Sequence, residues 1–146
     1  MQIINNIIHN KYLYIPFLLW LTVQTFKVIT ELVKDKRLNV RRIIGAGGMP
    51  SSHSAIVCSI ATLIGKDCGF DSAIFALAVI FSFIVMYDAA GVRRAAGKQA
   101  RILNKILETP GLTTGEVQGK LIEALGHTPI QVFVGAILGI IVGAIF

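Results

Sequence analysis

Apolar residues gather in four blocks along the chain, and polar residues separate these blocks. The blocks cover residues 12–33, 54–65, 72–87 and 129–146. About 20 apolar residues are needed to cross the hydrocarbon core of a bilayer. The first block meets this length, and a cleaved signal peptide is the alternative interpretation, although the block is long for one. The pattern predicts an all-α integral membrane bundle with about four membrane-embedded helices, folded as a single domain over residues 1–146.

The second block is too short for a full crossing. With residues 50–52 in front of it, the helix would begin part-way through the membrane. Such a start is tolerated where polar backbone lines a cavity inside the protein.

A polar stretch between the third and fourth blocks has helical periodicity. Apolar and basic residues recur there at helical spacing over residues 95–107, which predicts an amphipathic helix. This helix is expected to lie on the membrane surface or to cap the bundle. A loop rich in Pro, Gly and Thr follows at residues 109–115, and a second helix is expected over residues 113–125.

Three glycines with a spacing of four, Gly135, Gly139 and Gly143, lie in the last block. This spacing places them on one helix face, where another helix can approach closely. Two interpretations remain open, namely packing inside one chain and a contact between two copies. The second interpretation predicts a homodimer.

Composition agrees with a membrane location. Of the 146 residues, 54% are hydrophobic and 15% are charged, whereas soluble domains carry about 25% charged residues. The net charge is +6, and the basic residues lie between apolar blocks. This arrangement suits anionic lipid or phosphate better than nucleic acid, which we do not expect as a partner. Cys58 and Cys68 form no Cys-x-x-Cys motif and are interpreted as packing residues.

The distribution of basic residues predicts the topology. With four crossings, residues 34–50 and 88–127 share one side of the membrane, and both termini lie on the other side. Of the 14 Lys and Arg residues, 11 fall on the first side and only Lys11 and Lys66 fall on the second. The positive-inside rule then assigns the first side to the cytoplasm. We therefore expect a protein of the cytoplasmic (inner) membrane.

The stretch 45–54 is the most informative for chemistry. Glycines lead into Pro50, Ser51, Ser52 and His53, and an apolar helix follows. The free N–H groups of a helix N-terminus bind anions, and a histidine in the first turn can give a proton to a leaving oxygen. The alternative is an ordinary capped helix with a histidine at the membrane interface.

A second histidine, His127, comes just before the last block. Thr128 is expected to cap this helix and Pro129 to open it. Two histidines at helix starts on one side of the membrane suit phosphoryl transfer, in which one attacks phosphorus and the other protonates the leaving group. A turn histidine without chemistry is the alternative.

These stretches resemble motifs of a known superfamily. Pro50-Ser51-Ser52-His53 resembles the Pro-Ser-Gly-His motif of the type 2 phosphatidic acid phosphatases and vanadium haloperoxidases. His127 and the eight residues after it resemble their His-x-Pro-x-Asp-Val-x-x-Gly motif, and Lys34 with Arg41 resembles Lys-x6-Arg. The runs Gly-Gly-Met-Pro-Ser-Ser-His-Ser and Tyr-Asp-Ala-Ala-Gly-Val-Arg-Arg look like the short divergent branch of that superfamily.

The resemblance implies roles for individual residues. The histidine that matches His127 is the nucleophile and forms a phosphohistidine, and the one that matches His53 is the general acid. The groups that hold the phosphate correspond to Lys34, Arg41, Ser51 and Ser52. The superfamily phosphatases imply no cofactor and no metal.

The chain departs from the motifs at three places. Gln131 stands where the superfamily has the Asp that orients the nucleophile, and the usual arginine before His127 is missing. Arg42 stands where the first motif has a proline after its arginine. Asp88, Glu123 and Gln131 itself are the candidates for the orienting group, and Arg93 is the candidate for the arginine.

The expected function is metal-independent hydrolysis of a lipid phosphate or polyprenyl diphosphate through a phosphohistidine, as in an acid phosphatase. Membrane lipids and a lipid phosphate substrate are the expected partners. A non-catalytic lipid- or phosphate-binding membrane protein is the first alternative, favoured by the change from Asp to Gln131 and opposed by the two histidines. A vanadate-dependent haloperoxidase-like protein is the second.

Overall fold

The fold was analysed in a computed structural model of the chain. It describes residues 1–36, 48–109, 121, 123 and 126–146, without the side chains of residues 34 and 35. These residues form helices and no strand, so the all-α prediction is confirmed for them. The helices are α1 (Gln2–Ile8), α2 (Lys11–Asp35), α3 (Ser52–Cys68), α4 (Ala73–Ala90), α5 (Val92–Leu107) and α6 (Pro129–Ile145).

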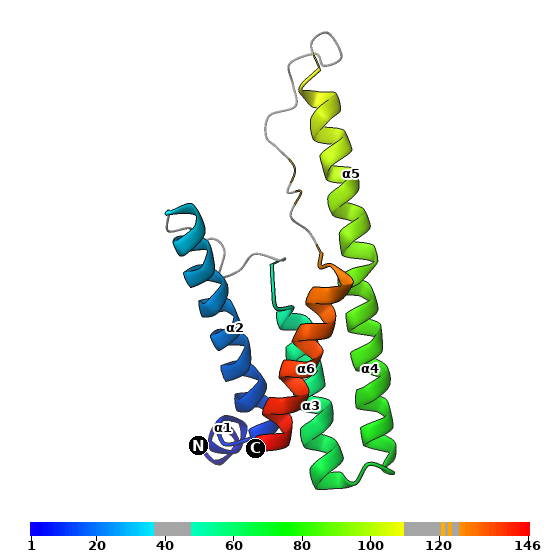
Figure 1. Cartoon of the computed structure of the whole chain (residues 1–146). Coiled ribbons are helices and arrows are strands. Elements are labelled where there is room, and N and C mark those ends of the chain that lie inside the picture. The colour runs from blue at the N-terminus through cyan, green and yellow to red at the C-terminus, as the bar shows by residue number, and fades with distance from the viewer. Residues whose placement is uncertain (37–47, 110–120, 122, 124–125) are drawn as a thin grey trace.

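Helix α3 is the centre of the bundle, and α2, α4 and α6 surround it (Figure 1). The three glycines of α6 are buried against α3. A Cβ added at Gly135 or Gly139 would clash with the backbone oxygen of Ser51 or Ala55. The glycine stripe therefore serves packing inside one chain, and it is not an argument for a homodimer.

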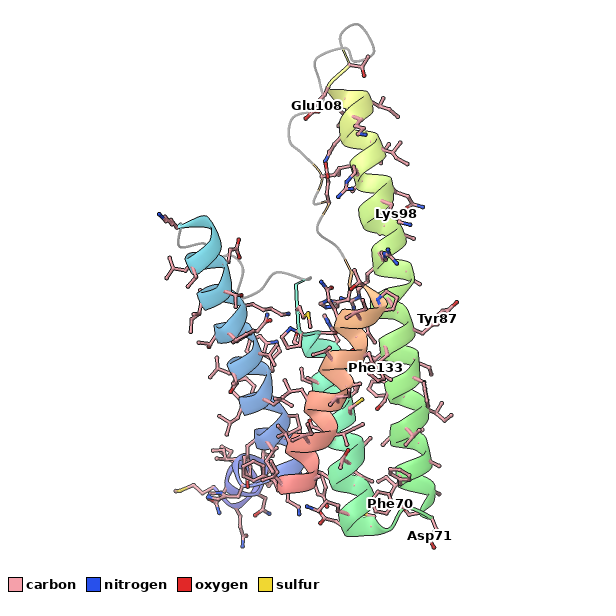
Figure 2. All side chains as sticks on the ribbon, in the orientation of Figure 1. Phe70, Asp71, Tyr87, Lys98, Glu108 and Phe133 are labelled. Atoms are coloured by element: carbon pink, nitrogen blue, oxygen red, sulfur yellow. The ribbon has the colours of Figure 1, made fainter. Side chains whose placement is uncertain are left out.

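Large apolar side chains cover the outside of the bundle, while many of the buried residues are small or are serines. On α4, for example, Tyr87 is 78% exposed and points away from the other helices (Figure 2). The buried set contains Ser51, Ser54, Ser59 and Ala55. Exposed apolar surface of this extent marks a membrane or partner surface rather than a soluble monomer.

Two stretches are long and apolar enough to cross a membrane, residues 11–33 and the α4–α5 stretch 73–107. Helix α6 is apolar but has 17 residues, and α3 also has 17. At about 1.5 Å per residue, each of these two helices is about 25 Å long, slightly less than the hydrocarbon core. The structure thus supports a membrane helical bundle, and the number of four embedded helices stays a prediction.

Helix α5 differs from the expected surface helix. Only Gly91 separates it from α4, and the backbone hydrogen bonds Gly91 N to Tyr87 O (2.8 Å) and Ala95 N to Gly91 O (2.9 Å) bridge the junction. As a result, α5 extends α4 beyond the end of the bundle (Figure 1). It neither caps the bundle nor turns away from α4.

The helix expected over residues 113–125 lies mostly outside the described residues. The two of its residues that are described, Leu121 and Glu123, are not helical. Both residues instead bind α5, Leu121 through its backbone and Glu123 through its side chain. The side-chain amide of Asn104 in α5 donates to the C=O of Leu121 and accepts from its N–H, both at 2.9 Å. The short helix α1 is a further element that the block pattern did not predict.

Polar contacts hold the end of the bundle where α2 begins and where α3 and α6 end. Lys11 forms an ion pair with Asp67 (2.7 Å), and the Tyr12 hydroxyl donates a hydrogen bond to the same carboxylate. Lys66 donates to the carbonyl of Ala144 (2.7 Å) near the C-terminus of α6, where a cation offsets the helix dipole. These contacts fix the start of α2 and the end of α6 against the end of α3.

Candidate active site

The first turns of α3 and α6 lie side by side and form the floor of the candidate site. Ser51 caps α3, and its hydroxyl oxygen accepts hydrogen bonds from the N–H (3.4 Å) and the hydroxyl (3.0 Å) of Ser54. Its own N–H donates to the carbonyl of Gln131 in α6 (3.0 Å). Ser51 and Ser52 are buried. The structure therefore joins the two motifs through Ser51 and Gln131, which are 80 residues apart in the sequence.

His127 is fixed between the end of α4 and the start of α6. It is 1% exposed, and its N–H donates to the carbonyl of Ala89 (2.9 Å). Gly126 before it has a φ of +82°, and a Cβ there would clash with the backbone of Arg93 and Arg94. Only glycine fits this close approach, so Gly126 determines where the histidine lies.

Gln131 orients the ring of His127. Its Oε1 lies 3.3 Å from Nδ1 of His127 and accepts a hydrogen bond from the backbone N–H of Thr128 (3.0 Å). A backbone N–H can only donate, which fixes oxygen rather than nitrogen at this position. Nδ1 of His127 therefore carries the proton that faces Oε1. Nε2 is left with a free electron pair, as a nucleophile requires.

The surroundings of His127 keep it neutral. Burial lowers its pKa to about 4, and the positive charge of Lys27 in α2 adds to this shift. The hydrogen bond with Gln131 opposes the shift only in part. Near neutral pH the side chain is thus an uncharged imidazole, the form that can attack phosphorus.

His53 faces His127 from the first turn of α3. The two ring centroids are 5.8 Å apart, and the rings meet edge to face at 64°. Arg93 lies 3.4 Å from Nε2 of His53 through Nη1, and its Nε binds Asp88 at 2.7 Å. Arginine only donates, so Nε2 of His53 is the acceptor in this structure. Asp88 thus orients Arg93 rather than His127.

The pKa of His53 is also shifted. Burial lowers it below the usual value of 6.5, and the charges of Arg93 and Lys27 lower it further, while Asp88 raises it. His53 therefore needs a nearby negative charge to hold a proton at neutral pH. A bound phosphate would supply this charge.

Two ring nitrogens of the site are buried without a hydrogen-bond partner of good geometry among the described residues. They are Nδ1 of His53 and Nε2 of His127. Buried polar atoms are nearly always satisfied in a folded protein, so these two suggest a place for a polar ligand. In the part of the chain that is described, no group of three or more His, Cys, Asp or Glu residues is placed to hold a metal ion.

The remaining predicted residues lie apart from the two histidines or outside the described chain. Lys34 is in the last turns of α2, and Arg41 falls in the segment 37–47 that is not described. The Glu123 carboxylate binds Arg101 (3.1 Å) and Asn104 (2.9 Å) of α5. Glu123 could face His127 across one helical turn only if the segment between them were helical, and residue 123 is not helical.

The prediction missed Lys27, which is 4% exposed in α2. Its charge acts on both histidines. A sequence signal existed, since an ionisable residue inside an apolar block marks a functional position more often than a structural one.

The fold and this pair of histidines define a small all-helical protein with the apolar exterior of a membrane protein. The sequence profile of the divergent PAP2 family matches residues 8–142. The chain therefore belongs to the divergent PAP2 family, as the motifs predicted. It is 40% identical over 129 residues to the "Uncharacterized membrane protein YuiD" of Bacillus subtilis (strain 168), which covers 81% of this chain and 82% of that relative. No solved structure matches the chain.

Proposed function

We propose that this protein is a metal-independent membrane phosphatase that cleaves a phosphate monoester or diphosphate of a lipid. The observation that carries the proposal is that a neutral, oriented His127 faces His53, with 5.8 Å between their ring centroids. Their unpartnered nitrogens and the nearby Arg93 suit a phosphoryl group between them.

The proposed reaction has two steps. Nε2 of His127 attacks phosphorus, the bond from phosphorus to the leaving oxygen breaks, and His53 gives its proton to that oxygen. A water molecule then attacks the phosphohistidine, gives a proton to His53 and releases inorganic phosphate. Arg93 and the N–H groups at the start of α3 stabilise the charge on the phosphoryl oxygens in both steps.

The apolar exterior favours a lipid substrate, because the headgroup can reach the helix starts while the hydrocarbon stays in the bilayer. The described basic residues beyond the bundle, on α5, lie at the same end as the site. By the positive-inside rule, this end belongs in the cytoplasm, and we propose the cytoplasmic face of the cytoplasmic membrane as the place of the reaction.

The test is phosphate release by the purified full-length protein in micelles. The substrates are phosphatidate, a lysophosphatidate and a polyprenyl diphosphate, each with and without EDTA. The wild type should release phosphate from at least one lipid and form an acid-labile phosphoprotein. His127→Ala should abolish both. His9→Ala is the matched control, because His9 lies in the exposed N-terminal segment.

A non-catalytic phosphate-binding protein is the second candidate, and Gln131 is the observation that favours it. An amide orients an imidazole but stabilises its cation less than a carboxylate does. This candidate predicts binding of lipid phosphates that depends on Arg93, with neither turnover nor a phosphoprotein.

A further inference from the structure

Helix α2 carries polar residues on the side that packs against α3. Gln24 and Lys27 are both buried there, and their spacing of three places them on one helix face. A charged residue inside a membrane bundle is costly and is retained mainly where it has a function. Lys27 takes no part in the reaction described above.

The contacts at the far end of the bundle set the height of Lys27. Helices α2 and α3 run in opposite directions (Figure 1) and are joined where Tyr12 binds Asp67. Lys27 is 15 residues beyond Tyr12, and His53 is 14 residues before Asp67. At about 1.5 Å per residue, these are rises of about 22 Å and about 21 Å. Lys27 and His53 therefore lie at the same level.

The same helix register places Lys34 beyond the level of the two histidines. It is seven residues beyond Lys27, which is about 10 Å further along α2. The motif comparison selected Lys34 by its spacing to Arg41, but the lysine of α2 that is level with the histidines is Lys27.

We propose that Lys27 is the cation of α2 that binds the substrate phosphate between His53 and His127. The proposal rests on the proposed function for its substrate and on burial and helix register for its position. A buried ammonium at the level of two ring nitrogens that lack a partner of good geometry among the described residues provides a point charge for a phosphate oxygen, which is a common use of lysine. Arg93 would bind the same group from the first turn of α5.

Lys27 also influences the protonation of both histidines, in addition to burial. It lowers the pKa of both, so the site stays free of further positive charge until an anion enters. Once the phosphate offsets the charge of Lys27, His53 can gain its proton. The other charged or titratable groups that act on these rings are Arg93 and Asp88 for His53, and His53 itself for His127. Hydrogen bonding by Gln131 and by the backbone of Gly48 raises the pKa of His127.

The test uses orthovanadate as the probe, because vanadate binding is measured without turnover. Lys27→Met should weaken vanadate binding at least tenfold and raise KM for the lipid phosphate more than it lowers kcat. Lys27→Arg keeps the charge and should stay within about threefold of the wild type. Lys98→Met is the matched control, since Lys98 points away from the bundle on α5 (Figure 2).

A second readout separates a binding role from a structural one. Removal of the Lys27 charge should shift the acid limb of kcat/KM to higher pH, because the pKa of His127 rises. In the wild type, vanadate should also move the Nζ resonance of Lys27, which tests the contact even if Lys27→Met does not fold. An unmoved resonance, or a larger loss of vanadate binding in Lys34→Met than in Lys27→Met, would overturn the proposal.

These outcomes are distinct from a failure of the proposed function. A wild type that binds vanadate through Lys27 but hydrolyses no lipid phosphate contradicts the phosphatase and supports the anion site. A wild type that hydrolyses a lipid phosphate equally well after Lys27→Met contradicts the role of Lys27 alone.

Discussion

Oε1 of Gln131 lies 3.3 Å from Nδ1 of His127 and binds the N–H of Thr128 as well. One side chain thus closes the capping box of α6 and orients the imidazole. The superfamily motif has a carboxylate at this position, and the amide preserves its geometry without its charge. In the proposed reaction, orientation of the nucleophile and stabilisation of its cation are therefore separated, and variants of Gln131 test this separation.

Gln131→Glu should restore the charge with little change in shape. A carboxylate beside His127 favours the imidazolium form and raises the pKa of His127 from about 4. We expect the acid limb of kcat/KM to move to higher pH, with the N-cap hydrogen bond of α6 retained. The measurement is the pH dependence of phosphate release from the best lipid substrate.

Gln131→Ala is the matched variant that removes both functions. It should lower kcat by about 100-fold or more, the scale of a misplaced acid–base group, and weaken the helix cap by about 1 kcal/mol. If Gln131→Ala kept full turnover, the orienting role of Gln131 would be wrong.

The wild-type pH profile follows from the two histidines. Attack needs neutral His127, so activity is lost as the pH falls through about 4. Protonation of the leaving oxygen needs charged His53, so activity is lost as the pH rises through its pKa, which in the free protein lies below 6.5. We expect a bell-shaped kcat/KM with an acidic optimum between these limits. A flat profile from pH 4 to pH 8 would contradict this assignment of acid and nucleophile.

The motifs predicted which residues lie close together better than the periodicity predicted the fold around them. Pro50-Ser51-Ser52-His53 and His127 with its capped helix were identified because their residue types have fixed local roles, and the structure brings them together. Glu123 was misplaced because the pattern could not show that Asn104 binds the backbone of residue 121 in place of a helix.

Lys27 illustrates a different limit of prediction from the sequence. Its burial depends on how α2 pairs with α3, and that register is set by Lys11 and Tyr12 binding Asp67, more than 50 residues away. The motif spacing between Lys34 and Arg41 selected Lys34. That spacing carries no information about how α2 pairs with α3. The path of α5 was missed for the same kind of reason, since one glycine permits either a turn or a continuous helix.

Gly139→Ala should destabilise the bundle. The added Cβ would clash with the backbone oxygen of Ala55, and overpacking of this kind costs about 1–3 kcal/mol. The measurement is the thermal unfolding midpoint in micelles. Ile140→Ala is the control, because Ile140 is 50% exposed.

The same variant tests the use of the glycine stripe. An unchanged midpoint for Gly139→Ala would show that α6 does not pack on α3 through this face. The homodimer stays a prediction for some other surface of the protein, and a detergent-corrected mass of two chains is the result that would support it.

The predicted topology can be read from a native cysteine. Cys68 is exposed at the end of α3, whereas Cys58 is buried, so a membrane-impermeant maleimide should label Cys68 alone. The count of 11 loop Lys and Arg residues against two predicts that the helix starts of the site lie in the cytoplasm and Cys68 outside. Intact cells should therefore be labelled, and Cys68→Ser should remove the signal. Labelling only after the cells are opened would place the candidate site on the outer face and reverse the proposed access of the substrate.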